Sequence, residues 1–364
     1  MRRITDDSGA VAETVQDDLR TDLMDWRAAH PRQDGRPAAI SDVATRIGVS
    51  SGTLSDWIAR KYAGDGGGVA RKIDLFLGEE AERAARPNVR QFAPTRIAKE
   101  MLGVINIAVR GNRMVAIIAE PGTGKTEVAL AFQRERGSCI YVRADDAFGD
   151  ARGISALLCA DVPELKEAAG LPHRKRVLAL RSFVQRRRNY VLIVDEVQNL
   201  TRDGLELIRA LHDLSDLQNH RCLPVVLLGD KGFFRLLLKA RNGERCVVSP
   251  QLVRRIAPVY DATRDGVDSD GDLYSVEDIR AILRNSRLKL VTPAGERWLT
   301  RLSNVEGWGR LGLAMRVCEL ALDVRRKRPL DVADLHMAHK MLLGPDLSTE
   351  CAEQAGGELA AATA

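Results

Sequence analysis

One short stretch, residues 119–126, constrains the fold of this chain more than any other. It reads Ala-Glu-Pro-Gly-Thr-Gly-Lys-Thr, and it joins an apolar run, 114–118, to a segment of helical character, 127–132. An apolar strand, a glycine-rich loop and a helix are the three parts of a P-loop, whose backbone N–H groups surround phosphate oxygens. The positive N-terminal end of the helix strengthens this attraction. The sequence therefore predicts an α/β nucleotide-binding domain.

The residue types of this loop predict individual roles. We expect the Lys125 ammonium to reach the β- and γ-phosphates and to act in catalysis, and the Thr126 hydroxyl to hold Mg²⁺. Ala119 stands where the motif usually begins with Gly. The residues predicted to bind nucleotide here are Ala119, Glu120, Pro121, Gly122, Thr123, Gly124, Lys125, Thr126 and Glu127.

A second motif lies about seventy residues further along the chain, where the apolar run 190–194 ends in Asp195 and Glu196. An apolar strand that ends in two carboxylates after a P-loop is typical of a Walker B strand. We expect Asp195 to hold Mg²⁺ through water, as a second metal residue beside Thr126. Glu196 is the predicted catalytic residue that activates the attacking water for in-line displacement at the γ-phosphate. The pair predicts ATP hydrolysis that requires Mg²⁺.

Further polar positions follow later strands of the predicted core. Asp230 follows the apolar run 223–228, at a place where a polar residue commonly reaches the γ-phosphate or the water. Arg254 or Arg255 could enter the nucleotide site of a neighbouring subunit as an arginine finger. The sequence does not choose between these two, and a surface ion pair is the alternative for either. No Asn-Lys-x-Asp motif for reading guanine is present, which favours ATP over GTP.

Four helical patterns follow the core, at 275–285, 293–303, 309–326 and 330–342. They indicate a small helical lid of the kind found in AAA+ modules. An Arg early in such a lid commonly contacts the γ-phosphate, so Arg310 is the first candidate for nucleotide binding and Arg316 the second. The last residues, 346–364, are rich in Ala, Gly and Glu, which predicts disorder.

The N-terminal part predicts a DNA-binding unit. Residues 40–58 have the pattern of a helix-turn-helix, with Gly48 at the turn, between helices expected at 11–29 and 69–86. An αα-hairpin used only for packing is the alternative. The second helix carries no outward Arg, Asn or Gln that could read base edges, so weak or non-specific DNA binding is expected. The predicted DNA contacts are Ser50, Ser51, Thr53, Ser55, Arg60 and Lys61.

Composition supports this interpretation. A net charge of +5 is compatible with a nucleic-acid partner. The six cysteines show no C-x-x-C spacing, which indicates reduced thiols in a cytoplasmic protein. No run of ~18 apolar residues is present, so no membrane partner is expected.

The pair His336 and His339 is interpreted as two surface histidines rather than a zinc site. A basic helix expected at 174–188 could contact nucleic acid or a subunit, or could be a solvated face.

With these motifs in this order, residues 11–345 resemble the transposition B proteins of bacteriophage Mu and its prophage relatives. The narrower signal is the helix-turn-helix fused to a compact AAA+ core. The resemblance implies non-specific, ATP-dependent binding of double-stranded DNA by a helical filament or ring of subunits. It further implies delivery of that target DNA to a DDE transposase, stimulation of transposition and target immunity. Such proteins are encoded by a phage or prophage and act in the cytoplasm of the bacterial host.

The expected fold class is a P-loop AAA+ ATPase core, with a parallel sheet flanked by helices and a helical lid, preceded by an all-α domain. The predicted regions are a helix-turn-helix domain at 1–86, a linker at 87–94, a core at 95–262, a lid at 263–345 and a tail at 346–364.

Three other functions remain open from the sequence. One is an ATPase of the helicase-loader class, and another is an ATP-switched transcriptional regulator. The third is a DNA scaffold with an inactive site, against which the intact Lys125, Asp195 and Glu196 argue.

Overall fold

The chain divides into two units, Met1–Pro87 and Asn88–Ala364, and the apolar core of the first is separate from the cores of the second. The computed structural model describes residues 11–32, 36–85, 91–187, 189–214, 222–325 and 329–354. Each unit is described by itself, because the positions of the two relative to one another are not determined.

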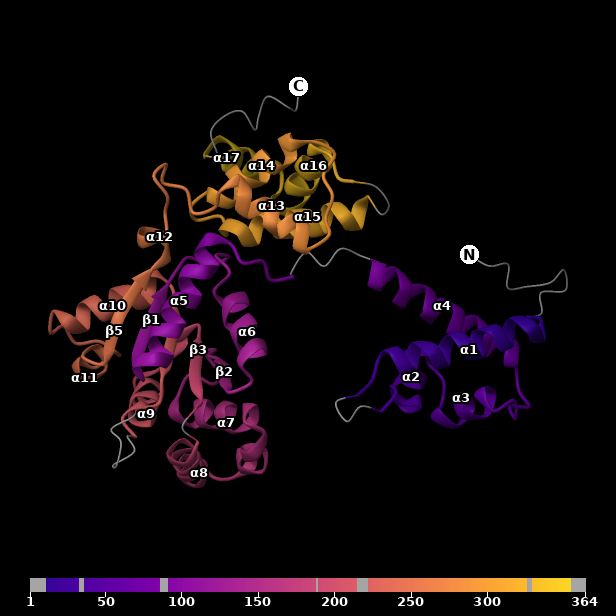
Figure 1. Cartoon of the computed structure of the whole chain (residues 1–364), viewed down its shortest axis with the longest axis horizontal. Coiled ribbons are helices and arrows are strands. Elements are labelled where there is room, and N and C mark those ends of the chain that lie inside the picture. The colour runs from indigo at the N-terminus through magenta and orange to yellow at the C-terminus, as the bar shows by residue number, and fades with distance from the viewer. Residues whose placement is uncertain are drawn as a thin grey trace. The chain divides into compact units, whose positions relative to one another are not determined.

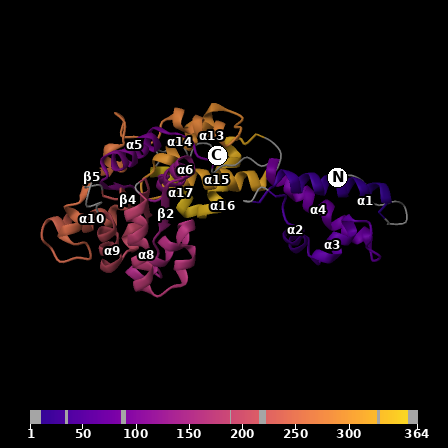
Figure 2. The same ribbon diagram turned by 60° about the horizontal axis from the view of Figure 1, so that its bottom comes forward.

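The N-terminal unit is all helical (Figures 1 and 2). Leu23, Leu54, Trp57 and Ile73 are almost completely buried and form the centre of its core. The last helix begins three residues earlier than the predicted residue 69, inside a glycine-rich stretch. The four helices are α1 (Glu13–Ala29), α2 (Ile40–Ile47), α3 (Ser51–Ile58) and α4 (Gly66–Ala85).

A tight turn joins α2 to α3 at the expected place. Gly48 has a φ of 66°, a left-handed conformation that glycine adopts without the strain of a side chain. Ser50 then caps α3, because its hydroxyl accepts the N–H of Thr53 at 3.0 Å. These two local features set the angle between the helices.

The second unit is built on a five-stranded parallel sheet with the order β2-β3-β4-β1-β5. Every residue of β1, β3 and β4 is buried. These strands read as continuous apolar runs because helices cover both faces of the sheet. The strands are β1 (Met114–Ile118), β2 (Cys139–Arg143), β3 (Val191–Asp195), β4 (Val225–Gly229) and β5 (Ile256–Asp261). The predicted α/β class is confirmed.

Alternate residues of β1 show how the layers are arranged. Val115 and Ile117 pack into a core with α5 (Arg96–Gly111) and α6 (Lys125–Arg136). Met114 and Ile118 face the opposite core. That core holds α7 (Ala151–Asp161), α8 (His173–Arg186), α9 (Arg202–His212) and α10 (Lys231–Arg241), with the short helices η1 (Pro163–Gly170), η2 (Val197–Asn199) and α11 (Pro250–Val253) nearby.

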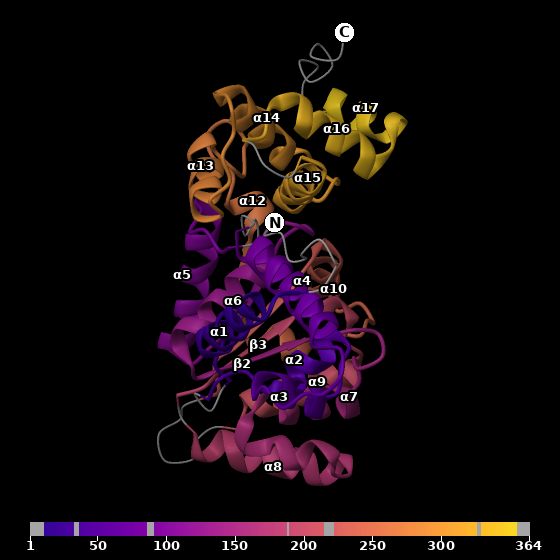
Figure 3. The same cartoon turned by 90° about the vertical axis from the view of Figure 1, so that its right-hand side faces the viewer.

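The basic helix is present as α8, and Figures 1 and 3 show it at the end of this unit opposite the C-terminal helices. Arg176 does not belong to its exposed face, since its guanidinium donates to the carbonyl oxygens of Leu171 and Arg152. The exposed cations of α8 are Arg174, Lys175, Arg181 and Arg186.

Five helices gather in one cluster beyond the short α12 (Ala262–Asp265), and we call this cluster the lid (Figure 3). Leu299, Leu313, Val317 and Leu335 are fully buried in its core. The helices are α13 (Val276–Asn285), α14 (Pro293–Asn304), α15 (Arg310–Val324), α16 (Val332–Leu343) and α17 (Pro345–Gln354).

Two expectations about this region are corrected. Disorder was expected from residue 346, but α17 is helical and buries Ser348 and Cys351 against the lid. Residues 355–364 lie outside the described part of the chain. His339, expected at the surface, is 3% exposed and bonds the Ser348 hydroxyl at 2.9 Å. His339 is buried because it lies on the face of α16 that also buries Leu335 and Ala338 in the lid core.

Within the described residues, no group of three or more His, Cys, Asp or Glu could hold a metal ion. Likewise, no described helix is long and apolar enough to cross a membrane.

Candidate nucleotide-binding site

The P-loop lies at the carboxyl end of β1, which is flanked in the sheet by β4 and β5. Gly122 and Gly124 have φ values of 80° and 86°, so both glycines occupy left-handed positions that the loop requires. The N–H of Ala119 donates to the Gly229 carbonyl at 3.1 Å, which ties the start of the loop to β4. Ala119 directly follows β1 and is fully buried, and its backbone is not among the left-handed positions, so glycine is not required there.

Lys125 is buried at the start of α6. Its ammonium donates to the carbonyl oxygens of Ala119 at 2.7 Å and Glu120 at 3.1 Å. Burial lowers the pKa of Lys125, while the charges of Glu196, Asp195 and other carboxylates oppose that shift. The ammonium therefore lies inside the loop, where phosphate oxygens would bind. Thr123 is also buried and bonds the Glu120 carbonyl at 2.8 Å, while Pro121 is exposed and Glu127 is half-buried on α6.

The two predicted metal residues are in direct contact. The Thr126 hydroxyl donates to Asp195 Oδ2 at 2.6 Å, and Asp195 is completely buried. Tyr141 of β2 donates to the same oxygen at 2.9 Å, and the N–H of Glu196 donates to Oδ1 at 2.9 Å. Burial, followed by the Asp195 charge, raises the pKa of Tyr141. These hydroxyl and carboxylate oxygens are the ligand types that Mg²⁺ prefers, so the residues fit a Mg²⁺–nucleotide complex.

Tyr141 was not among the predicted site residues. The only signal in the sequence is a tyrosine inside the apolar run of β2, since a buried phenol needs a hydrogen-bond partner. The identity of that partner depends on how β2 and β3 pair, with Arg143 opposite Asp195.

Glu196 follows Asp195 at the edge of the sheet. Its φ of 54° is left-handed, a conformation that a non-glycine residue adopts at a cost of about 1–3 kcal/mol. Gln198 bonds one carboxylate oxygen, and Arg143 lies 3.4 Å from the other. The carboxylate is 28% exposed, so water can approach the predicted base.

The other predicted polar residues of the core have different surroundings. Asp230 caps α10, where its carboxylate accepts the N–H of Phe233 at 3.0 Å. Arg255 is paired with Asp213 at 2.7 Å, so the ion-pair alternative holds for this residue. The Arg254 side chain is exposed, and the described part of the chain provides it with no ion pair. The two candidates therefore differ in that Arg255 has an ion pair and Arg254 has none among the described residues.

The lid contacts the P-loop directly. Arg310 donates from Nε to Glu120 Oε2 at 2.7 Å and is 8% exposed. The Gly312 N–H donates to the Gly122 carbonyl at 2.9 Å, and the Tyr274 hydroxyl donates to the Thr123 carbonyl at 3.0 Å.

Of the two lid arginines, Arg310 is therefore at the loop, while Arg316 is exposed further along α15. A Cβ atom on Gly122 would lie 1.8 Å from the Gly309 carbonyl oxygen, so this approach requires glycine in the loop.

The predicted DNA-contacting residues lie on and just after α3. Ser50 and Thr53 are engaged in the helix cap, with their hydroxyl oxygens 2.9 Å apart. Arg60 is 65% exposed and pairs with Asp17 at 2.7 Å. Ser51, Ser55 and Lys61 are exposed as well.

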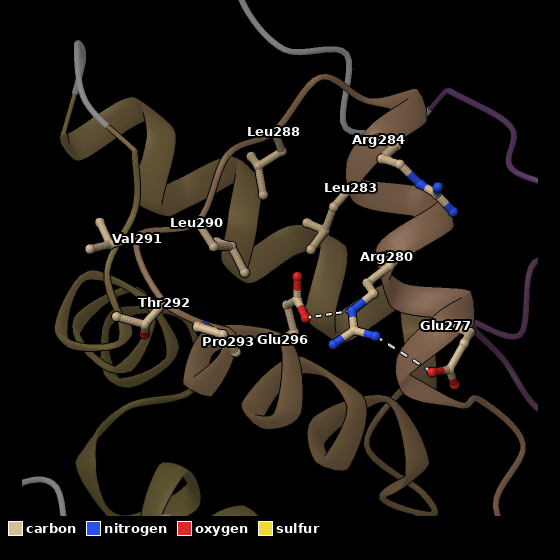
Figure 4. Close-up of a pocket in the computed structure, with 10 residues that line it drawn as sticks. All are labelled: Glu277, Arg280, Leu283, Arg284, Leu288, Leu290, Val291, Thr292, Pro293 and Glu296. Atoms are coloured by element: carbon tan, nitrogen blue, oxygen red, sulfur yellow. Dashed lines mark hydrogen bonds and ion pairs between the residues drawn. The ribbon is translucent and has the colours of Figure 1, made fainter.

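A groove of about 630 Å³ lies elsewhere on the lid (Figure 4). Apolar side chains of α13 and of the segment before α14 line it, and Arg280 lies between Glu296, at 2.7 Å, and Glu277, at 3.5 Å. None of the predicted nucleotide or DNA residues lines this groove, so it is separate from the P-loop site.

A family model described as an AAA domain matches residues 109–237, which include the P-loop, Asp195 and Glu196. The chain has an AAA+ P-loop fold. This is the fold of nucleotide-binding ATPases, and the order of strands and the adjacent lid agree with it.

Two curated phage proteins are similar to this AAA+ chain. The ATP-dependent target DNA activator B of Escherichia phage Mu is 27% identical over 269 residues, which cover 72% of this chain and 80% of the activator. The ATP-dependent target DNA activator B of Escherichia phage D108 is 25% identical over 269 residues, which also cover 72% of this chain and 80% of that protein. These matches confirm the resemblance expected from the motifs. Among solved structures, the Walker-type ATPase of Pyrococcus abyssi has a TM-score of 0.47 and 16% identity, covering 77% of this chain and 79% of that one.

Proposed function

We propose that this chain is an ATP-dependent, DNA-binding AAA+ ATPase that forms filaments on target DNA and delivers it to a DDE transposase. The observation that carries the proposal is the contact of Thr126 with Asp195 beside Lys125, at the edge of a sheet that also carries Glu196. The similarity to activator B, whose name specifies ATP-dependent activation of target DNA, supports the transposition role.

The residues of the site divide the chemistry of hydrolysis among them. Bound ATP with Mg²⁺ supplies the γ-phosphoryl group and the charge that activates it. Lys125 and the loop N–H groups hold the phosphates, and Thr126 and Asp195 hold the metal. Glu196 takes the proton of the attacking water. Arg310 responds to the γ-phosphate from the lid, and Asp230 lies at the end of β4 beside the site. Arg254 completes the site of the next subunit in the filament.

DNA binding belongs, in this proposal, to the N-terminal domain at 1–86, joined by the linker at 87–94 to the core. Ser51, Ser55, Arg60 and Lys61 contact the DNA backbone, and no side chain among them reads base edges bidentately. Binding should therefore be independent of sequence and should weaken steeply with salt, by a slope of about −0.9 for each neutralised phosphate. The protein acts in the cytoplasm of a bacterial host that carries the phage or prophage.

Electron microscopy with random-sequence duplex DNA tests this function. With ATP, the wild type should form filaments on the DNA, and Lys125→Ala should form none, because the phosphates lose their buried cation. Glu196→Gln keeps the geometry of the carboxylate but not its basicity, so its filaments should persist after the wild-type filaments disassemble. Filaments of Lys125→Ala with ATP would contradict the proposal. Closed rings, or complexes at one DNA sequence only, would favour a helicase loader or a regulator instead.

A further inference from the structure

Glu120 places a negative charge in a loop that must receive phosphate. P-loops bind phosphate through backbone N–H groups and a lysine, so the motif needs no carboxylate at this position. The Glu120 side chain is 9% exposed, and its peptide carbonyl accepts the Lys125 ammonium at 3.1 Å. Because like charges repel across a poorly solvated site, this carboxylate opposes the incoming nucleotide.

The two carboxylate oxygens of Glu120 hold cations from two other elements. Oε2 accepts from Arg310 Nε at 2.7 Å, and Oε1 lies 2.6 Å from the Lys231 ammonium. Arg310 is the first residue of α15 in the lid, and Lys231 is the first residue of α10. Lys231 also pairs with Glu306, at 2.6 Å, just before α15. Glu120 therefore joins the P-loop, the core and the lid.

Glu120 is ionised in this arrangement. Burial by itself would raise the pKa of its carboxyl, but the hydrogen bonds from Arg310 and Lys231 outweigh burial and lower the pKa to about 2. The pKa of Lys231 is raised in turn, mainly by the hydrogen bond with Glu120.

The backbone around Arg310 shows that its position depends on these contacts. Arg310 has a φ of 49°, and Gly309 before it has a φ of 94°. A left-handed arginine is a strained conformation that persists only where its surroundings hold it. Arg310 is held by two hydrogen bonds, because its Nη1 donates to the Asn304 carbonyl at 2.6 Å in addition to the contact of its Nε with Glu120. Loss of the Glu120 contact should therefore loosen the first turn of α15.

We propose that Glu120 determines how strongly the protein distinguishes ATP from ADP, because its carboxylate occupies Arg310 and Lys231 until a γ-phosphate competes for them. This inference rests on the proposed ATPase function. ATP brings a third phosphate toward the cations that Glu120 holds, so its binding must break the carboxylate contacts and release the lid junction. ADP lacks that phosphate and leaves Glu120 with its partners.

Glu120→Gln tests the role of the charge, because glutamine keeps the shape of the side chain. Relative to wild type, the dissociation constant for ATP should fall at least about fivefold, the lower end of ordinary coupling between sites. The constant for ADP should change less than about twofold. Glu296→Gln is the matched control, since it removes the carboxylate partner of Arg280 in the lid groove, which is separate from the P-loop. It should leave both constants within about twofold of wild type.

Hydrogen exchange of the nucleotide-free protein provides a second readout that needs no ATP. In Glu120→Gln the amide of Gly312, which bonds the P-loop, should exchange faster than in wild type, while Glu296→Gln should match wild type. Glu120→Asp keeps the charge but is one methylene shorter, so it should lose the contact with Arg310 and exchange as fast as Glu120→Gln. Unchanged Gly312 exchange together with an unchanged ratio of ATP to ADP affinity would overturn the proposal. A wild type that binds neither nucleotide would instead refute the ATPase function, and the exchange comparison would still test the contact.

Discussion

At the scale of single residues, one buried carboxylate organises the part of the site that is proposed to hold Mg²⁺. Asp195 receives the hydroxyls of Thr126 and Tyr141 on one oxygen and a backbone N–H on the other. These donors fix the orientation of the carboxylate before any ion arrives, which reduces the cost of assembling a Mg²⁺ site. Tyr141 does not belong to either nucleotide motif, yet it contacts the same oxygen as the motif threonine.

We predict that Tyr141→Phe weakens Mg²⁺ binding and leaves the fold intact. The ring can still pack in β2, but Asp195 loses a donor that orients it. Loss of such an outer contact typically costs about tenfold or more in metal affinity. A titration of ATPase activity against Mg²⁺ should therefore show a midpoint about tenfold higher than in wild type. Tyr190→Phe is the control, since the ring of Tyr190 packs on Phe183, 4.9 Å away. Equal midpoints for Tyr141→Phe and wild type would contradict this prediction.

At the scale of elements, α14, α16 and α17 meet at a buried aromatic cluster in the lid. Trp298 lies 5.6 Å from the ring of His339 in an edge arrangement, and His339 bonds Ser348 of α17. The Nε2 atom of His339 is buried without a partner in the described structure. Burial lowers the pKa of His339 to about 4, because a charged imidazole would be poorly solvated there.

The lid should therefore lose stability in acid. The pKa of His339 is lower in the folded state than its ordinary value of 6.5, so its contribution to stability is fully present above about pH 6.5 and is lost as pH falls toward 4. We expect the wild type to be less stable at pH 5 than at pH 7 by on the order of 1 kcal/mol from this group. Thermal unfolding of His339→Asn should show a shallower dependence on pH over this range. His173→Asn on α8 removes a histidine outside the lid, and an equally shallow slope in that variant would contradict the assignment.

At the scale of the whole molecule, we expect a second subunit to complete the nucleotide site. The N-terminal unit has its own core, and the second unit holds all the predicted nucleotide residues. Arg254 is exposed beyond the end of α11 and has no ion pair among the described residues, whereas Arg255 is paired with Asp213. An exposed arginine without a partner, in a protein proposed to assemble on DNA, is suited to act on a neighbouring subunit.

We predict that Arg254→Ala lowers ATPase activity about 10³-fold, as expected for loss of an arginine finger, while Arg255→Ala retains most of it. An assay of mixed Arg254→Ala and Glu196→Gln subunits tests whether Arg254 acts on the nucleotide site of a neighbouring subunit. Subunits with Arg254→Ala keep an intact Glu196, and subunits with Glu196→Gln keep an intact Arg254. Mixed assemblies should therefore recover activity at the interfaces where both intact residues meet. No recovery on mixing, or equal losses for the two arginine variants, would count against a finger at residue 254.

The sequence by itself determined the nucleotide chemistry of this protein, because a P-loop and a strand ending in two carboxylates are local patterns. Hydrophobic periodicity likewise predicted the strands, the four N-terminal helices and most of the lid. Tertiary structure decided which side chains meet. Arg310 and Glu120 are 190 residues apart, Tyr141 and Asp195 are 54 apart, and only the packing of lid and strands brings each pair together. Packing also determined that α17 buries Ser348 and Cys351 in the lid core, and that Arg255 but not Arg254 has an ion pair among the described residues. Contacts between elements depend on distances in space, which spacing along the chain does not specify.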